Sequence, residues 1–349
     1  MSRRSAIPAR LSPSAERSHD PHFTIAIPTF NRAHWLRSCV ASALSQTVES
    51  FEVVVSDNAS DDATIQVLGE FDDERLRIIR QPRNIGAIGN WNACLSAANG
   101  TFVTMLSDDD SVAPFFLERC NTLITDDVDL SLVVSLGDVF DGPTGFTRPA
   151  TRSRILRSGV WQGTEILKEF LRGNISPQMC TLAIKTEALR ARGGFPAGWP
   201  HTGDLASWVP LLLQGKAGFV NESCGTYHSH SETQTAHFSL RTRLEDFDRL
   251  GSVIVEEAEQ NVRDPSVVAE IRSLVRSYAA ANFIGHMAIE RSRGASRREI
   301  ASAAWSWRRR LAGANIADLW GLARPVALFI LPLSAIRLVR RAKRRLNVL

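Results

Sequence analysis

The feature that most constrains the fold is a series of short apolar runs, each of which ends in polar or acidic residues. Runs of this length, rich in β-branched residues and bounded by polar clusters, are typical of buried strands. The runs and the residues that follow them are FTIAIP (23–28) before TFNR (29–32), FEVVV (51–55) before SDN (56–58), and TFVTML (101–106) before SDDD (107–110).

Helical patterns separate these predicted strands. Apolar residues recur at helical spacing in Ala33–Gln46, and helices are also expected over Ala63–Phe71 and Ile88–Ala98, with one more strand at Leu76–Ile79. Strands that alternate with helices and are apolar almost throughout predict an α/β fold with a mostly parallel, doubly wound sheet.

The alternation becomes looser after Pro114. We expect helices over 115–124, 163–171 and 205–213, strands over 130–136 and 181–185, and a loop over 137–158. From about Leu240 the pattern is helical and rich in Arg and Ala.

In open α/β sheets, ligands bind beyond the carboxyl ends of the strands, so the three polar clusters should face one crevice. No GxGxxG follows the first strand, which disfavours a dinucleotide-binding domain. The chain also lacks GxxxxGK[ST], which excludes a P-loop NTPase.

The acidic run Asp108-Asp109-Asp110 is the most informative of the clusters. Three carboxylates at one strand end repel one another unless a cation is present. Mg²⁺ or Mn²⁺ would take one or two of them and fill its other positions with phosphate oxygens and water. A solvated acidic turn that caps the helix after Pro114 is the alternative.

Residues 23–120 resemble the donor-binding half of family 2 glycosyltransferases, of the type that makes bacterial surface polysaccharides. The matching segments stand in the family's order: IAIPTFNR (25–32), VVVSDNASDD (53–62), RNIGAIGNWNACLSAANGTFVTMLSDDD (83–110) and Pro114. A looser match extends to about residue 235 through GGF (193–195), GDLASWVPLLLQG (203–215) and YHSH (227–230). The resemblance implies the GT-A fold, which is Rossmann-like, here with a C-terminal helical extension.

The resemblance also implies a donor pocket and a metal site. The residues it assigns to the nucleoside-diphosphate sugar are Pro28, Thr29, Asn31, Asp57, Asn84 and Asp108. The ligands it assigns to Mg²⁺ or Mn²⁺ are Asp109, Asp110 and His230. Aligned on Pro114, the family's Asp-x-Asp element falls on residues 107–109 with Ser107 in the first place, whereas Asp108-x-Asp110 also fits, so both registers stay open.

Asp204 matches the family's catalytic base, although Gly203 replaces the acid that usually precedes it. A carboxylate there would take the proton of the acceptor hydroxyl as it attacks the anomeric carbon, in one step with inversion. The alternative is that Asp204 caps a helix over 205–213.

Two His residues and three other side chains are further candidates. His228 and His230 would share one face of an extended segment. Trp199, His201 and Trp208 could form a platform for the acceptor, with ordinary packing the simpler interpretation for Trp208.

The charge is distributed unevenly along the chain. Residues 23–289 have a net charge of −9 and residues 290–349 a net charge of +11. Pro325–Ile336 is uncharged but too short to span a bilayer, and a polybasic stretch follows it. This end fits a helix on an anionic membrane, or else a solvated extension that packs on protein. Nucleic acid is disfavoured as a partner, because no nucleic-acid motif is present.

The predicted organisation is a disordered leader at 1–22, a GT-A domain at 23–239 and a basic helical region at 240–349. An organellar transit peptide is an alternative for the leader. Residues 23–120 would form the nucleotide-sugar half of the domain and residues 121–239 the acceptor half. Five scattered Cys residues without a CxxC pair favour a reducing cytoplasm.

The expected function is sugar transfer from a nucleoside-diphosphate sugar to a glycan or lipid-linked acceptor, at the inner face of the cell membrane. A non-catalytic, membrane-associated binding protein on a GT-A scaffold is the alternative. A nucleotidyltransferase fits less well, because residues 28–32 are not a Gly-rich basic loop.

Overall fold

The computed structural model describes residues 22–124, 129–230, 233, 238–294, 296, 298–299 and 302. The predicted leader, apart from His22, and the basic segment 325–349 lie outside these residues. The membrane-binding segment proposed from the sequence is therefore outside the described part of the chain.

The N-terminal half is built from parallel strands and the helices between them, as the sequence predicts. The sheet order is β3-β2-β1-β4, and each of these neighbouring pairs is parallel. The apolar runs place β1 and β2 almost wholly in the core. The elements are β1 (Phe23–Thr29), α1 (Ala33–Leu44), β2 (Phe51–Asp57), α2 (Thr64–Leu68), β3 (Leu76–Arg80), α3 (Ala87–Ala97) and β4 (Phe102–Met105).

The second half continues the same sheet, in the order β4-β9-β6-β10-β5, with parallel and antiparallel pairs mixed. Its elements up to the last strand are β5 (Ser111–Val112), α4 (Phe116–Asn121), β6 (Leu132–Asp141), β7 (Phe146–Arg148), β8 (Gly159–Gln162), α5 (Gly163–Leu171), η1 (Met179–Thr181), β9 (Leu182–Lys185), α6 (Thr186–Ala191), α7 (Gly203–Trp208), η2 (Val209–Leu213) and β10 (Lys216–Ser229).

Two expectations for this half are wrong in part. The predicted loop over 137–158 contains the end of β6 and its antiparallel partner β7. The predicted helix over 205–213 begins at Gly203 and passes into the 3₁₀ helix η2 at Val209. Pro210 stands in the first turn of η2, and a proline inside an α-helix would remove a hydrogen bond and clash with the preceding turn.

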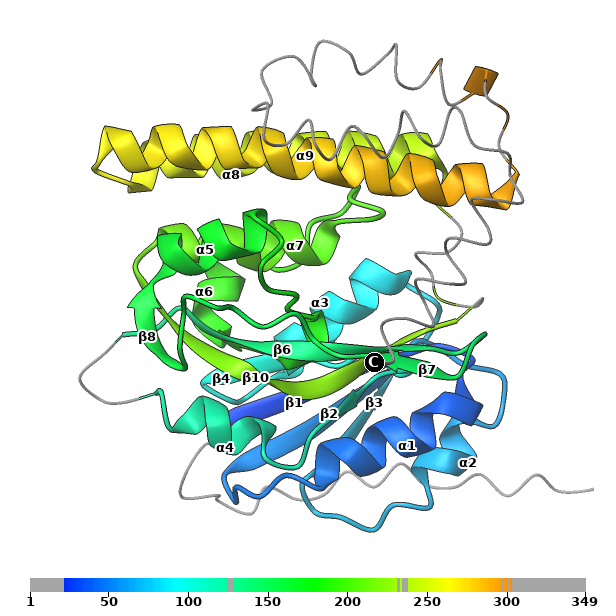
Figure 1. Cartoon of the computed structure of the whole chain (residues 1–349). Coiled ribbons are helices and arrows are strands. Elements are labelled where there is room, and N and C mark those ends of the chain that lie inside the picture. The colour runs from blue at the N-terminus through cyan, green and yellow to red at the C-terminus, as the bar shows by residue number, and fades with distance from the viewer. Residues whose placement is uncertain are drawn as a thin grey trace, which may run out of the picture.

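Helices cover both faces of the sheet (Figure 1). On one face α1, α2 and α4 pack around Val40, Val67 and Phe116. On the other face α3, α5, α6 and α7 lie on a second core that contains Leu95, Ile166 and Trp208. The predicted α/β architecture is therefore confirmed.

A pair of long helices forms a layer above α5 and α7 (Figure 1). They are α8 (Leu240–Asn261) and α9 (Pro265–Arg293), which confirm the predicted helical extension over the described residues. Leu250, Ile254 and Ile271 from this pair belong to the same core as Trp208. Within the described residues, no helix combines the length and the apolar character needed to cross a bilayer.

Candidate active site

A cavity of about 620 Å³ opens where β1, β2 and β4 end. The predicted convergence of the three strand ends on one crevice is therefore confirmed. The loop before α7 closes the cavity from the other side, so residues far apart in sequence share its wall. Among the lining residues are Pro28, Thr29, Phe30, Arg32, Asn58, Asn84, Trp91, Asp108, Asp109, Asp110, Gln178, Trp199, His201, Asp204, Tyr227 and Phe238.

The acidic run after β4 is buried in the wall of this cavity. Asp108, Asp109 and Asp110 are 7%, 9% and 4% exposed, so the interpretation as a solvated acidic turn is wrong. Burial, and after it the neighbouring Asp109 carboxylate, raise the pKa of Asp108 to about 7.

Two basic side chains meet Asp109. Its Oδ2 lies 2.5 Å from Nη1 of Arg32 and 3.1 Å from Nε2 of His230. Arg32 also lies 3.7 Å from Oδ1 of Asp108. The guanidinium therefore supplies the positive charge that the buried carboxylates require.

Asp109 supplies the carboxylate oxygen that a hard divalent cation prefers, and His230 adds a nitrogen ligand beside it. A carboxylate and an imidazole converge there, and Mg²⁺ or Mn²⁺ completes its coordination with water and substrate phosphates. Within the described ranges, no three His, Cys, Asp or Glu side chains form a ready-made metal site. The metal-ligand roles of Asp109, Asp110 and His230 thus remain predictions.

Asp110 is held by β10. Its Oδ1 accepts a hydrogen bond from the backbone N–H of His228, 2.9 Å away. Burial, with the neighbouring Asp109 carboxylate, raises its pKa well above the ordinary carboxyl value. The rings of His228 and His230 both lie near Trp35, as expected if the two side chains share one face of an extended segment. The ring of His230 stacks on that of Trp35, with their centres 4.6 Å apart.

The end of β2 is built by a small amide network. Asn58 Nδ2 donates to Asn84 Oδ1 at 3.0 Å, and the N–H of Gly86 donates to that same oxygen at 2.8 Å. Asn58 Oδ1 accepts from the N–H of Ile85. Gly86 has φ = +79°, a left-handed conformation that glycine adopts readily. The network fixes the turn that carries Asn84 into the cavity.

Two of the predicted donor residues do not line the cavity and instead connect the strand ends, Asp57 from a buried position and Asn31 from an exposed one. Asp57 is fully buried, accepts from the N–H of Ser60 and lies 3.3 Å from Nε of Arg80. Asn31 has φ = +54° and accepts a hydrogen bond from the N–H of Asp61. Neither is among the residues that line the cavity.

Asp204 lines the same cavity as the acidic run and stands in the first turn of α7. The residue at the N-cap is Thr202, so the expectation that Asp204 caps a helix over 205–213 is wrong. Burial raises the pKa of Asp204 to about 6. A carboxyl group with that pKa is ionised at neutral pH and can accept a proton.

The three candidate platform residues do not act together. Trp199 and His201 line the cavity. Trp208 is 2% exposed and packs against Phe170, which agrees with the packing interpretation.

The sequence argument missed the wall residues Trp91, Gln178 and Phe238, and it assigned Arg32 to the crevice without a separate role. Arg32 ends the polar cluster after the first strand. The other three come from segments that carry no polar motif at a strand end.

Residues 24–190 match the family described as glycosyl transferase family 2. The chain is 35% identical over 209 residues to chondroitin synthase of Pasteurella multocida strain Pm70, an alignment that covers 58% of this chain and 20% of that protein. It is 37% identical over 95 residues to GalNAc(5)-diNAcBac-PP-undecaprenol beta-1,3-glucosyltransferase of Campylobacter jejuni, which covers 26% of this chain and 31% of that protein. The chain therefore spans only about a fifth to a third of these relatives.

Solved structures share the fold over most of the chain. Staphylococcus aureus TarS 1–349 in complex with UDP-GlcNAc has a TM-score of 0.61, with 15% identity and 92% of each chain covered. Mannosyltransferase PcManGT from Pyrobaculum calidifontis, in complex with GDP-Man and Mn²⁺, has a TM-score of 0.53 and 16% identity, covering 95% of this chain and 86% of that one. These likenesses confirm the predicted GT-A fold.

Proposed function

We propose that the chain is a family 2 glycosyl transferase that moves a sugar from a nucleoside-diphosphate sugar to a hydroxyl group of a glycan or lipid-linked acceptor. The observation that carries this proposal is the convergence of Asp204 with the acidic run after β4 on one cavity. The first supplies a base, and the second supplies a place for a cation and a diphosphate. The relatives named as polysaccharide synthases support a role in polysaccharide synthesis.

The reaction we propose is a single displacement with inversion. The Asp204 carboxylate takes the proton of the acceptor hydroxyl while that oxygen bonds to the anomeric carbon. The bond from the anomeric carbon to the phosphate oxygen breaks, and the nucleoside diphosphate leaves with the electron pair. Burial favours the neutral form of Asp204 and so increases its tendency to take the proton.

Asp109 and His230 are the residues we propose to hold Mg²⁺ or Mn²⁺, with Asp108 and Asp110 beside them. When bound, the ion would offset the negative charge that develops on the leaving diphosphate. Arg32 stands next to these carboxylates and can face the same diphosphate oxygens. The complexes of TarS with UDP-GlcNAc and of PcManGT with GDP-Man and Mn²⁺ support a nucleotide-sugar donor and a divalent ion.

We further propose that the basic C-terminal region brings the enzyme to an anionic membrane at the inner face of the cell. The support comes from the sequence, where polybasic residues 337–345 follow an uncharged stretch. One relative's name specifies a lipid-linked substrate, which agrees with a reaction at a membrane. Deletion of 325–349 should abolish sedimentation with anionic vesicles, and unchanged sedimentation would contradict this proposal.

A panel of nucleotide sugars tests the function. Wild-type protein is melted with each compound and Mn²⁺, and the release of nucleoside diphosphate is then measured. A donor at 100 times its Kd should stabilise the native state by about 2.7 kcal/mol, so the true donor should stand out.

Asp109→Ala is the matched variant for this test. We expect it to lose metal-dependent turnover of the selected donor. A donor that stabilises the wild type but is never turned over, under any metal, would favour the non-catalytic alternative.

A further inference from the structure

The helix α8, which lies beyond the matched family region, holds the loop that leads into α7, the helix whose first turn contains Asp204. The loop enters α7 through Gly198, Trp199, His201 and Thr202. Asp246 is 6% exposed, and its Oδ2 accepts hydrogen bonds from the N–H groups of His201 at 2.7 Å and of Thr202 at 3.2 Å. Hydrogen bonds to an ionised carboxylate are about twice as strong as neutral ones.

One turn along the same face of α8, Arg249 makes a second contact with this loop. Its Nη1 donates to the carbonyl oxygen of Gly198 at 3.2 Å, and its guanidinium lies 4.1 Å from the ring centre of Trp199. Trp199 lines the active-site cavity. Arg249 therefore fixes one face of a wall residue from behind.

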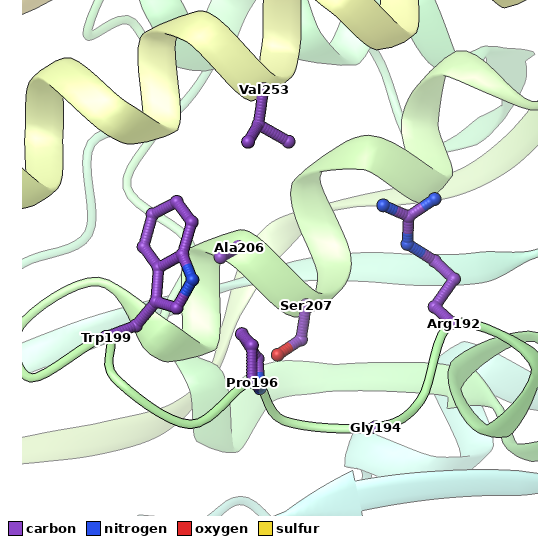
Figure 2. Close-up of a pocket in the computed structure, with 7 residues that line it drawn as sticks. All are labelled: Arg192, Gly194, Pro196, Trp199, Ala206, Ser207 and Val253. Carbon is purple, nitrogen blue, oxygen red and sulfur yellow. The ribbon is translucent and has the colours of Figure 1, made fainter.

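Val253, one turn further along α8, packs against the core that contains Trp199 and Ala206. A small cavity of about 180 Å³ separates α8 from α7, and Figure 2 shows Val253 of α8 pointing toward Trp199 and Ala206. Beyond it, Glu257 pairs with Arg192 at 2.8 Å. Side chains along α8, from Asp246 to Glu257, therefore contact the segment that connects α6 to α7.

We propose that Asp246 and Arg249 are positioning residues, which set the place of Asp204 by anchoring residues 198–202 to α8. This inference rests on the proposed function. Thr202 is the N-cap of α7, and its carbonyl oxygen accepts the first helical hydrogen bond from Ala206. Fixing the N–H of Thr202 therefore fixes the start of the helix, two residues before the base.

The test compares Asp246→Ala, Asp246→Asn and Arg249→Ala with Arg241→Gln. Arg241 is a control on the same helix, because its exposed side chain pairs along α8 with Glu245 and has no other ion pair among the described residues. Each variant is melted first, and turnover of the donor selected from the panel is then measured with Mn²⁺. Asp246→Asn keeps an oxygen that can accept the two hydrogen bonds, and it serves as the conservative variant if Asp246→Ala does not fold.

We expect Asp246→Ala to lower kcat by about 10- to 100-fold, because a displacement of about 1 Å at a reacting group costs up to 10²-fold. Binding of UDP or GDP with Mn²⁺ should stay within about twofold of wild type, since these contacts hold residues 198–202 and not the acidic run after β4. Asp246→Asn should recover part of the loss, and Arg249→Ala should lower kcat less than Asp246→Ala. Arg241→Gln should behave as wild type.

Hydrogen exchange gives a readout that does not depend on turnover. The amides of His201 and Thr202 should exchange faster in Asp246→Ala than in wild type, while those of β1 should not change. Wild-type kcat in Asp246→Ala, or unchanged protection of these amides, would overturn the inference. If wild-type protein turned over no donor, the proposed function would fail, and the exchange rates alone would decide whether Asp246 anchors the loop.

Discussion

Nη1 of Arg32 lies 2.5 Å from Oδ2 of Asp109, so a guanidinium stands beside the carboxylate expected to bind the metal. The pair joins the segment after β1 to the segment after β4. These are the two strand ends between which a diphosphate would lie. Arg32 is therefore placed to neutralise the buried acids before a cation and a donor arrive.

Arg32→Met should increase the affinity for Mn²⁺ measured without nucleotide. The variant keeps most of the side-chain volume but removes a positive charge within 4 Å of two carboxylates, and this charge opposes the binding of a second cation. We expect about tenfold tighter binding by titration calorimetry, whereas Arg32→Lys should stay near wild type. Unchanged Mn²⁺ affinity in Arg32→Met would contradict this role.

The rate should depend on pH through Asp204. Burial raises its pKa to about 6, and only the ionised form can take a proton. We expect kcat/KM with the selected donor to fall below about pH 6 and to level off above it. An acid limb near pH 4, the range of an exposed carboxyl, would indicate that another group is titrating.

The same pKa predicts how Asp204 affects stability. The folded-state pKa lies above the ordinary carboxyl value of 3.8, so the native state binds this proton more tightly than the unfolded state. Its stabilising contribution is complete below about pH 4 and is lost as the pH rises through about 6. Asp204→Asn, which cannot ionise, should melt a few degrees above wild type at pH 8. The difference in melting temperature between Asp204→Asn and wild type should shrink at pH 4. An equal or larger difference at pH 4 would contradict the predicted loss of stability on ionisation of Asp204.

The first half of the fold could be predicted because its strands are local apolar runs. In β2 each residue of FEVVVSD is buried, so the pattern in the sequence and the burial in the structure coincide. The strand ends then follow from topology, because parallel strands bring Thr29 and Asp108 to the same edge.

β10 could not be predicted in the same way. Its sequence, KAGFVNESCGTYHS, mixes apolar and polar residues without a clear period. Pairing with β6, β5 and β8 determines its conformation, and these partners are remote in sequence. The hydrogen bond of His228 to Asp110 and that of His201 to Asp246 also join residues that are far apart in the sequence. No local sequence pattern predicts these two contacts.

Trp208 should contribute to stability rather than to acceptor binding. Its side chain is 2% exposed, and its ring lies 5.6 Å from that of Phe170. Trp208→Ala should lower the free energy of unfolding in urea by about 3–5 kcal/mol, because truncation leaves a cavity in the core. Trp208→Phe should cost less. A loss below about 1 kcal/mol in Trp208→Ala would show that the site is not packed as described.

The role of Asp204 is the central claim, and one measurement tests it most directly. The rate of nucleoside diphosphate release from the selected donor is compared, with saturating Mn²⁺, between wild type and Asp204→Asn. We expect the variant to bind the donor with a Kd within about twofold of wild type and to turn it over at least about 100-fold more slowly, as for loss of a general base. Turnover by Asp204→Asn at the wild-type rate would contradict the assignment of Asp204 as the base.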